Sequence, residues 1–148
     1  MVRRRELSLF LVSAVATTHF PAALAPAAAP AEAAVHSPPA HVEPVAGSDL
    51  RRITLTDRAA ARIDVRAEEV RADASGQVVV PYSAILYDLS GATWVYISPA
   101  PRAFVRHPVA VARIDGGTAY LKEGPPVGTS VVTVGVPQLY GAEKGVGH

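Results

Sequence analysis

The residues that could do chemistry are few and stand apart in this chain of 148 residues. Ser83 lies between Tyr82 and Ala84, without the flanking glycines that place a nucleophilic serine on a sharp strand-to-helix turn. Glu68 and Glu69 are adjacent, so a strand would point them to opposite faces and they could not act as a pair. We therefore expect a domain that is not an enzyme.

The sequence also lacks residues suited to binding a metal or a cofactor. The sequence has no cysteine, which excludes a thiol nucleophile, a disulfide and a cysteine-ligated zinc or iron–sulfur centre. His36 and His41 lie in a segment without fixed geometry, and neither a carboxylate nor a third imidazole converges on them locally. His107, beside Pro108, is expected at a sheet edge. Residues 124–128 lack the lysine of a phosphate-binding loop. We predict no catalytic residue, metal site or cofactor.

The first 49 residues are expected to precede the folded domain. Three arginines at 3–5 and an apolar run at 7–16 are typical of an export signal, and the run is shorter than the roughly 20 residues that span a bilayer. We predict a signal peptide at 1–31, with an uncleaved anchor as the alternative. The alanine- and proline-rich segment that follows predicts a disordered linker at 32–49.

The charge balance argues against a nucleic-acid partner. The formal net charge is +1, from 14 basic and 13 acidic residues. Removal of the leader takes away three arginines and one glutamate, so the remaining chain is close to neutral. Nucleic-acid binders carry a basic surface that such a domain lacks.

The domain predicted at 50–148 begins with a strand and a short helix. Residues 51–55 alternate as a strand does, and Thr56 can cap a helix of about two turns. Residues 64–70 return to an extended pattern, and 71–77 form a polar connection.

The stretch 78–97 is the densest in strand-forming residues. Asp88–Gly91 lies between two such runs and predicts a β-hairpin in which Gly91 takes a positive φ. Trp94 and Tyr96 share one face of the second run. Packing in the core or on the sheet explains them, and a platform for a glycan or peptide is the alternative.

Further strands follow this stretch. Residues 104–111 form a strand interrupted at Pro108, 115–117 form a hairpin turn, and 131–134 form a buried strand. We predict a mainly β fold: a small antiparallel sandwich or roll of about six to eight short strands with one short helix, after a disordered N-terminal segment. Its expected core comprises Ile85, Leu86, Val95, Ile97, Val109, Val111, Val131, Val132 and Val134.

Four segments, in this order, resemble a known family. They are 80–86 (VPYSAIL), 93–97 (TWVYI), 106–111 (RHPVAV) and 124–135 (GPPVGTSVVTVG). They resemble the C-terminal part of the periplasmic adaptor subunits, or membrane fusion proteins, of resistance-nodulation-division (RND) efflux pumps. The strand at 53–56 and its alanine-rich helix resemble the segment that precedes the lipoyl half in such adaptors. The resemblance covers about 50–148.

The chain departs from a complete adaptor, which also has a lipoyl domain, usually an α-helical hairpin, and a β-barrel. Only residues 71–77 stand where these domains would be inserted. The chain therefore resembles the membrane-proximal domain alone. In the family this domain lies near the inner membrane and contacts the periplasmic region of the pump.

The resemblance implies an exported protein in the periplasm of a Gram-negative-type cell, either free or associated with the inner membrane, that acts by protein–protein contact in transmembrane export. Its implied partner is an inner-membrane RND pump subunit, with a full-length adaptor as a further candidate, and its membrane contact is only indirect. Arg102, Arg106 and Tyr140 are the candidate interface residues. The alternatives are a free-standing secreted module that binds cell-wall glycan or a small ligand through Trp94 and Tyr96, and a truncated product without activity.

Overall fold

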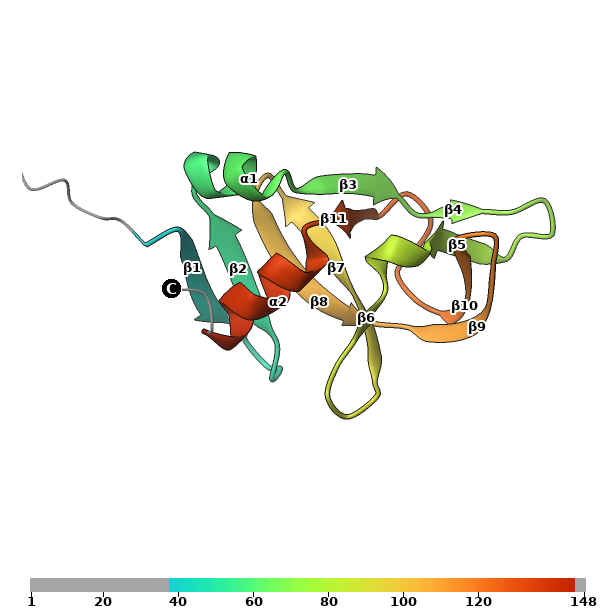
Figure 1. Cartoon of the computed structure of the whole chain (residues 1–148). Helices are drawn as coiled ribbons and strands as arrows, with labels where there is room; N and C mark the ends of the chain where they lie inside the picture. Colours follow the sequence, from blue (N-terminus) through green and yellow to red (C-terminus); the bar gives the residue numbers. More distant parts are fainter. Residues whose placement is uncertain (1–37, 146–148) are drawn as a thin grey trace, which may run out of the picture. The chain divides into compact units, whose positions relative to one another are not determined.

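The computed structural model describes residues 38–145, which form eleven strands and two α-helices in two antiparallel sheets (Figure 1). The mainly β class predicted from the sequence is confirmed. The predicted signal peptide at 1–31 and the first linker residues lie outside the described part. Within that part, no helix is long and apolar enough to cross a membrane.

The larger sheet has seven strands in the order β1-β2-β8-β7-β11-β3, and β6 also pairs with β7. All its pairings are antiparallel. Its strands are β1 (Ala40–Pro44), β2 (Arg51–Leu55), β3 (Arg66–Glu69), β6 (Leu86–Tyr87), β7 (Thr93–Ala100), β8 (Ala103–Pro108) and β11 (Ser130–Val134).

The smaller sheet has four strands in the order β4-β5-β10-β9. They are β4 (Arg71–Ala72), β5 (Val78–Pro81), β9 (Ala110–Asp115) and β10 (Thr118–Glu123). A single 3₁₀ turn, η1 (Tyr82–Ala84), follows β5 where Pro81 ends the strand.

Two long segments pass from one sheet to the other. β3 continues into β4 through Val70, and β8 continues into β9 through Val109. Both valines are buried in a core cluster that also contains Val80, Val95 and Val131. The two sheets therefore share one apolar interior at these crossings.

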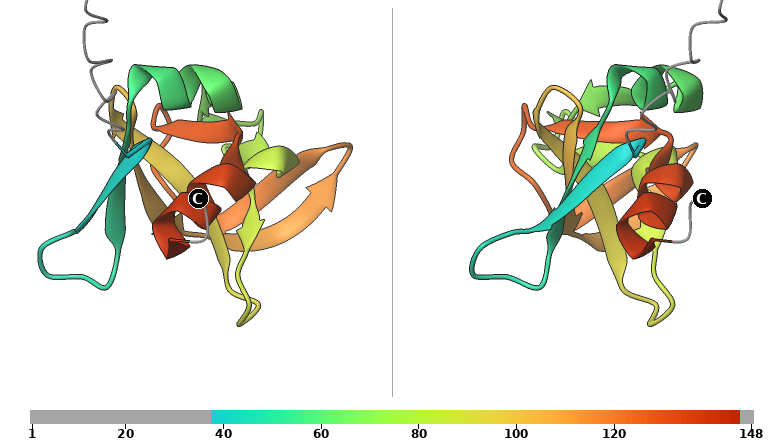
Figure 2. Two further views of the ribbon diagram at one scale, coloured as in Figure 1. Left: turned by 60° about the vertical axis from the view of Figure 1, so that its left-hand side comes forward. Right: turned by 90° about the vertical axis from the view of Figure 1, so that its left-hand side faces the viewer.

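The two helices pack against the larger sheet. Helix α1 (Asp57–Ile63) begins after Thr56, whose Oγ1 accepts a hydrogen bond from the amide of Ala59 at 3.2 Å, as the sequence predicts. Helix α2 (Val136–Lys144) packs Leu139 into a second core cluster, with Ile53, Leu55, Tyr96, Phe104, Val132 and Val136. Figure 2 shows α2 in red beside the strands of this sheet.

Both predicted hairpins are confirmed. β6 and β7 pair around residues 88–92, where Gly91 has φ 84°. β9 and β10 pair around Gly116 and Gly117, at φ 53° and 81°. Of the nine expected core residues, five are buried: Ile85, Val95, Val109, Val131 and Val132. Leu86, Ile97 and Val111 are partly buried against the core clusters, and Val134 is 41% exposed.

The structure corrects the predicted linker at 40–44 and adds a helix. Residues 40–44 form β1, in which Val42 pairs with Ile53 and packs against the second core cluster. Helix α2 is a second helix, whereas the sequence predicted only one short helix in the domain. There are more strands than the predicted six to eight because β1 is added and because the two long segments each contribute one strand to each sheet.

Candidate functional site

Three residues of β7 and β8 face helix α2. Tyr96 and Arg106 are directly opposed in the antiparallel pair β7–β8. Trp94 lies two residues before Tyr96, so it shares the same face of the sheet. This face carries the polar cluster on which the candidate site is built.

Arg106 and Glu143 form an ion pair in the interior. Nη2 of Arg106 lies 2.8 Å from Oε1 of Glu143, and Nε donates to the same oxygen at 2.9 Å. The hydroxyl of Tyr96 donates to the other oxygen, Oε2, at 2.6 Å. Arg106 is 8% exposed and Glu143 is 3% exposed. Burial and the hydrogen bond to Glu143 raise the pKa of Tyr96 well above its ordinary value, so this hydroxyl remains a donor.

Aromatic rings lie close to the Arg106 guanidinium. Its central carbon is 4.7 Å from the centroid of the Trp94 ring and 5.9 Å from that of the Tyr140 ring. Nζ of Lys144 lies 5.5 Å from the same Tyr140 ring. Cation–π attraction at these distances supports the placement of α2 over β7 and β8.

Trp94 connects this cluster to the β6–β7 loop. Its indole Nε1 donates to Oδ2 of Asp88 at 2.9 Å. Oδ1 of Asp88 accepts from the amide and hydroxyl of Ser90, at 2.9 and 2.6 Å, and from the amide of Ala92 at 3.0 Å. The bonds from the Ser90 hydroxyl and from Trp94 lower the pKa of Asp88 to about 2.

The β4–β5 loop has the same construction. Oδ1 of Asp73 accepts from the amide and hydroxyl of Ser75, at 2.8 and 2.7 Å, and from the amide of Gln77 at 2.9 Å. Both loops have the sequence Asp-x-Ser-Gly-x, at 73–77 and 88–92. The repeated pattern is the sequence signal that could have identified the first loop as a hairpin turn. The sequence predicted only a polar connection there.

A hollow lies between the β6–β7 loop and helix α2. It is lined by Asp88, Leu89, Ser90, Tyr140 and Lys144. Leu89 is 101% exposed, so its side chain stands free of the fold. A polar loop, an exposed leucine and a lysine thus line the same hollow.

The three predicted interface residues fall in different environments. Arg106 and Tyr140 come together in the cluster, but Arg106 is in the interior and Tyr140 is half-buried. Arg102 is exposed in the turn between β7 and β8, at φ 61°, and its Nη1 lies 2.7 Å from Oδ1 of Asp57 on α1. Sequence reasoning missed the roles of Glu143 and Asp88. The partners of Glu143, Tyr96 and Arg106, lie 47 and 37 residues away and are brought to it only by the fold. The loop partners of Asp88 are local, and the Asp-x-Ser-Gly-x pattern is the signal that could have indicated them.

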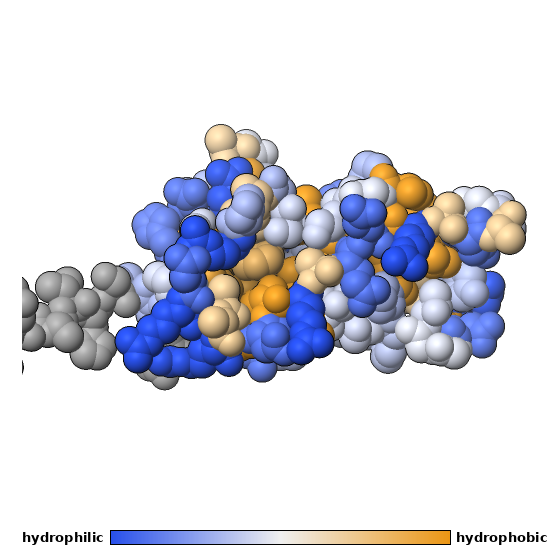
Figure 3. Space-filling view, turned by 90° about the horizontal axis from the view of Figure 1, so that it is seen from above, coloured by the Kyte–Doolittle hydropathy of each residue, from blue (hydrophilic) through white to orange (hydrophobic). Residues whose placement is uncertain are grey.

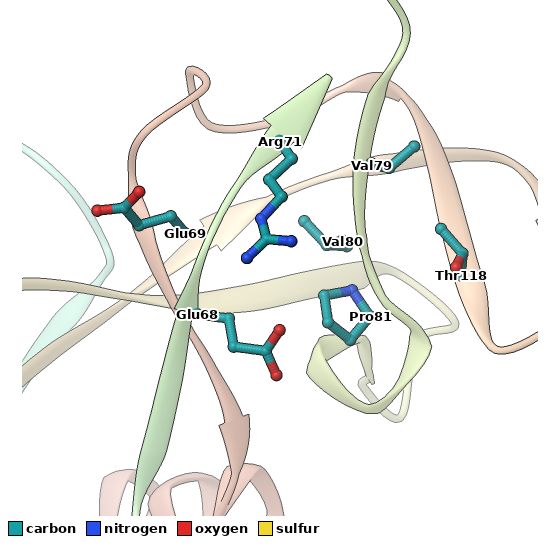
Figure 4. A pocket seen from close by; sticks show the side chains of 7 residues that line it. All are labelled: Glu68, Glu69, Arg71, Val79, Val80, Pro81 and Thr118. Carbon is teal, nitrogen blue, oxygen red and sulfur yellow. The ribbon is translucent and has the colours of Figure 1, made fainter. Parts of the chain in front are cut away.

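A second hollow lies where β3 meets the smaller sheet (Figure 4). Glu68 and Glu69 line it and lie on opposite sides of the strand, as the alternation of side chains predicts. Arg71, Pro81 and Thr118 complete its polar and apolar wall. Among residues 38–145, no group of three histidine, aspartate or glutamate side chains is placed to hold a metal ion.

A third, more apolar groove lies between α1, α2 and the start of β1. It is lined by Pro39, Ala40, Leu55, Ala59, Arg62, Ile63, Gln138, Gly141 and Ala142. Figure 3 looks at the molecule from above and shows hydrophobic areas separated by hydrophilic residues.

No family model, curated protein or solved structure matches this chain.

Proposed function

We propose that the protein is a periplasmic, adaptor-like protein that takes part in RND-type transmembrane export by protein–protein contact. One observation carries this proposal: the early and late segments that resemble the membrane-proximal domain of an adaptor pair in one sheet. β2 lies beside β8, with Ile53 opposite Phe104 and Thr54 opposite Ala103. A domain assembled from two separated halves can fold without the domains that a complete adaptor inserts between them.

The connection between the halves supports the same proposal. β3 continues into β4, and a five-residue loop then returns the chain to β5. This tight loop at 73–77 takes the place of the inserted domains, and Asp73 closes it with three hydrogen bonds. The chain would thus supply the pump-proximal contact of an adaptor, while a partner supplies the link to an outer channel.

The glycan-binding alternative finds less support in the geometry. A sugar platform needs exposed aromatic faces, but Tyr96 is 0% exposed and donates its hydroxyl to Glu143. Trp94 is half-buried, with the Arg106 guanidinium over its ring. The two aromatics therefore support the fold and do not form an open surface.

The proposal is tested by isolating the protein with its neighbours from its native cells. The full chain, tagged at its C-terminus, is cross-linked in cells that contain an RND pump, and the captured membrane proteins are identified by mass spectrometry. We expect enrichment of an RND pump subunit or a full-length adaptor over a tagged exported protein of similar size. Recovery of neither, with the tagged chain present in the periplasmic and membrane fractions, would contradict the proposal.

A further inference from the structure

The outer side of β1 is an edge of the larger sheet. β1 is the terminal strand in the order β1-β2-β8-β7-β11-β3, and within residues 38–145 no strand pairs with its far side. Figure 2 shows the β1–β2 hairpin, in cyan and teal, extending away from the rest of the domain. A strand edge of this kind carries backbone donors and acceptors that a strand of another chain can satisfy.

The ladder between β1 and β2 determines which backbone groups lie on this edge. The amide of Val45 donates to the carbonyl of Leu50 at 2.9 Å, and the amide of Thr56 donates to the carbonyl of Pro39 at 3.1 Å. Along an antiparallel pair, residues that bond to the neighbouring strand alternate with residues that face away from it. The residues of β1 that face away from β2 are therefore Ala40, Val42 and Pro44.

The side chains on the two faces of β1 differ in character. Ala40 and Val42 pack against the second core cluster, and Ala40 also lines the apolar groove between α1 and α2. On the other face, Nε2 of His41 lies 3.9 Å from Oε2 of Glu43, and Nη1 of Arg52 lies 3.7 Å from Oε1 of Glu43. One face of the edge is thus apolar, and the other carries an imidazole and a carboxylate two positions apart.

The strand is complementary to a second copy of itself in one antiparallel register. Registers that place at least two pairs of outward-facing residues opposite one another are centred on His41, Val42 or Glu43. A centre at His41 or Glu43 places that residue opposite its own copy, imidazole against imidazole or carboxylate against carboxylate. A centre at Val42 places each His41 opposite Glu43 of the other copy. Opposite charges across a strand pair stabilise it, whereas like charges destabilise it.

The register centred on Val42 also satisfies the backbone edge. The amide of each Val42 can donate to the carbonyl of the other, and the amide of Ala40 can donate to the carbonyl of Pro44 in the second copy. Pro44 has no amide hydrogen, so the pairing ends at this residue. Opposed residues project to the same face, so Pro44 of the second copy would lie beside Ala40, next to the apolar groove.

We propose that β1 is a dimerisation surface: two copies of the chain pair antiparallel through β1, centred on Val42, with each His41 opposite Glu43 of the other copy. The two larger sheets then form one continuous sheet, and a two-fold axis closes the assembly because each copy uses this edge once. A contact along so short an edge predicts a weak, concentration-dependent dimer. This dimer does not depend on the proposed function, since no other protein takes part in it.

Disulfide trapping tests the register, because the chain has no cysteine of its own. His41→Cys and Glu43→Cys are made separately in the full chain, with different tags, and then mixed. Opposed residues in a pair without mutual hydrogen bonds have Cα atoms about 4.5 Å apart, within reach of a disulfide. Under mild oxidation we expect chiefly the mixed dimer of the two variants. Self-linked dimers of either variant in equal or greater amount, or no linked dimer, would overturn the proposal.

Sedimentation equilibrium of the purified chain over a range of concentrations measures the dimer itself. His41→Glu places a carboxylate opposite Glu43 at both contacts, and we expect dimerisation to weaken roughly tenfold. The double variant His41→Glu with Glu43→Lys restores opposite charges and should recover most of this loss. The control Lys122→Glu changes an exposed residue of β10 and should leave the dimer unchanged.

Two results of this measurement would overturn the dimer: a wild-type chain that stays monomeric throughout, or an equal effect of His41→Glu and Lys122→Glu. Either result would leave the proposed function standing, because capture of a pump subunit or an adaptor is measured separately.

Discussion

Arg106 of β8 and Glu143 of α2 meet in the interior, 37 residues apart in the sequence, with Nη2 2.8 Å from Oε1. The pair lies beside the second core cluster, since the hydroxyl of Tyr96, a member of that cluster, donates a hydrogen bond to Glu143. Their side chains are only 9% and 2% exposed, so each charge depends on the other. This ion pair thus links helix α2 to the sheet.

Removal of one charge should be more harmful than removal of both. In Glu143→Leu the Arg106 guanidinium remains buried without its partner, and we expect a loss of about 3–5 kcal/mol in the free energy of unfolding. The double variant Arg106→Met with Glu143→Leu should lose less than this single variant, because no charge is left unpaired. Urea unfolding followed by circular dichroism measures both. A double variant less stable than Glu143→Leu would contradict this account.

Tyr96→Phe should destabilise the protein through the carboxylate that it leaves unsatisfied. The Tyr96 hydroxyl donates to Oε2 of Glu143 at 2.6 Å. Its removal leaves a buried acceptor without a partner, which costs about 1–3 kcal/mol. The control Tyr87→Phe changes a residue that is 49% exposed and should have little effect. Equal unfolding midpoints for the two variants would exclude this role for the hydroxyl.

Acid should weaken the β6–β7 loop. The pKa of Asp88 falls from 3.8 to about 2 in the folded protein. A lowered folded-state pKa adds stability above the unfolded-state pKa, and this stability is lost as the pH falls from about 4 through 2. Asp88→Asn lacks the ionised group, so its unfolding midpoint should change less between pH 6 and pH 2.5 than that of the wild type.

The fluorescence of Trp94, the only tryptophan, reports the acid-induced weakening of the β6–β7 loop, because its indole donates a hydrogen bond to Asp88.

The pKa of Asp73 is also lowered, chiefly by its hydrogen bond to Ser75. Asp73→Asn should therefore reduce the pH dependence of stability further when it is combined with Asp88→Asn. An identical pH dependence in Asp88→Asn and the wild type would refute this prediction.

The same substitution should destabilise the protein at one leucine and have almost no effect at another. Leu139 is 0% exposed and anchors α2 in the second core cluster. Leu139→Ala should lower the free energy of unfolding by about 2–5 kcal/mol. Leu89→Ala should change it by less than about 0.5 kcal/mol, since Leu89 is fully exposed. Thermal or urea unfolding of the two variants, side by side, checks both values.

Local sequence chemistry predicted two hairpin turns and the first helix. Gly91 and the pair Gly116–Gly117 mark hairpins because positive φ values suit glycine. Thr56 marks the start of α1 because its side chain can cap the first turn. These features depend on residues within a few positions of one another, so one sequence is enough to locate them.

Features that depend on distant partners were missed. β1 lies in an alanine- and proline-rich segment, and its Val42 becomes a strand residue only by pairing with Ile53. Helix α2 contains Pro137 and Gly141, which weaken a helical pattern. Glu143 looked like an ordinary surface carboxylate, because no local signal shows that Arg106 lies against it.

The crossings at Val70 and Val109 also determine how the domain carries a mechanical load. Each segment passes from one sheet into the other through a single buried valine, so these crossings join the sheets covalently. A pull on the loop at 73–77 is transmitted along β4 into β3, and a pull on β9 is transmitted into β8. Force applied at the smaller sheet is thus passed to the larger one through covalent backbone.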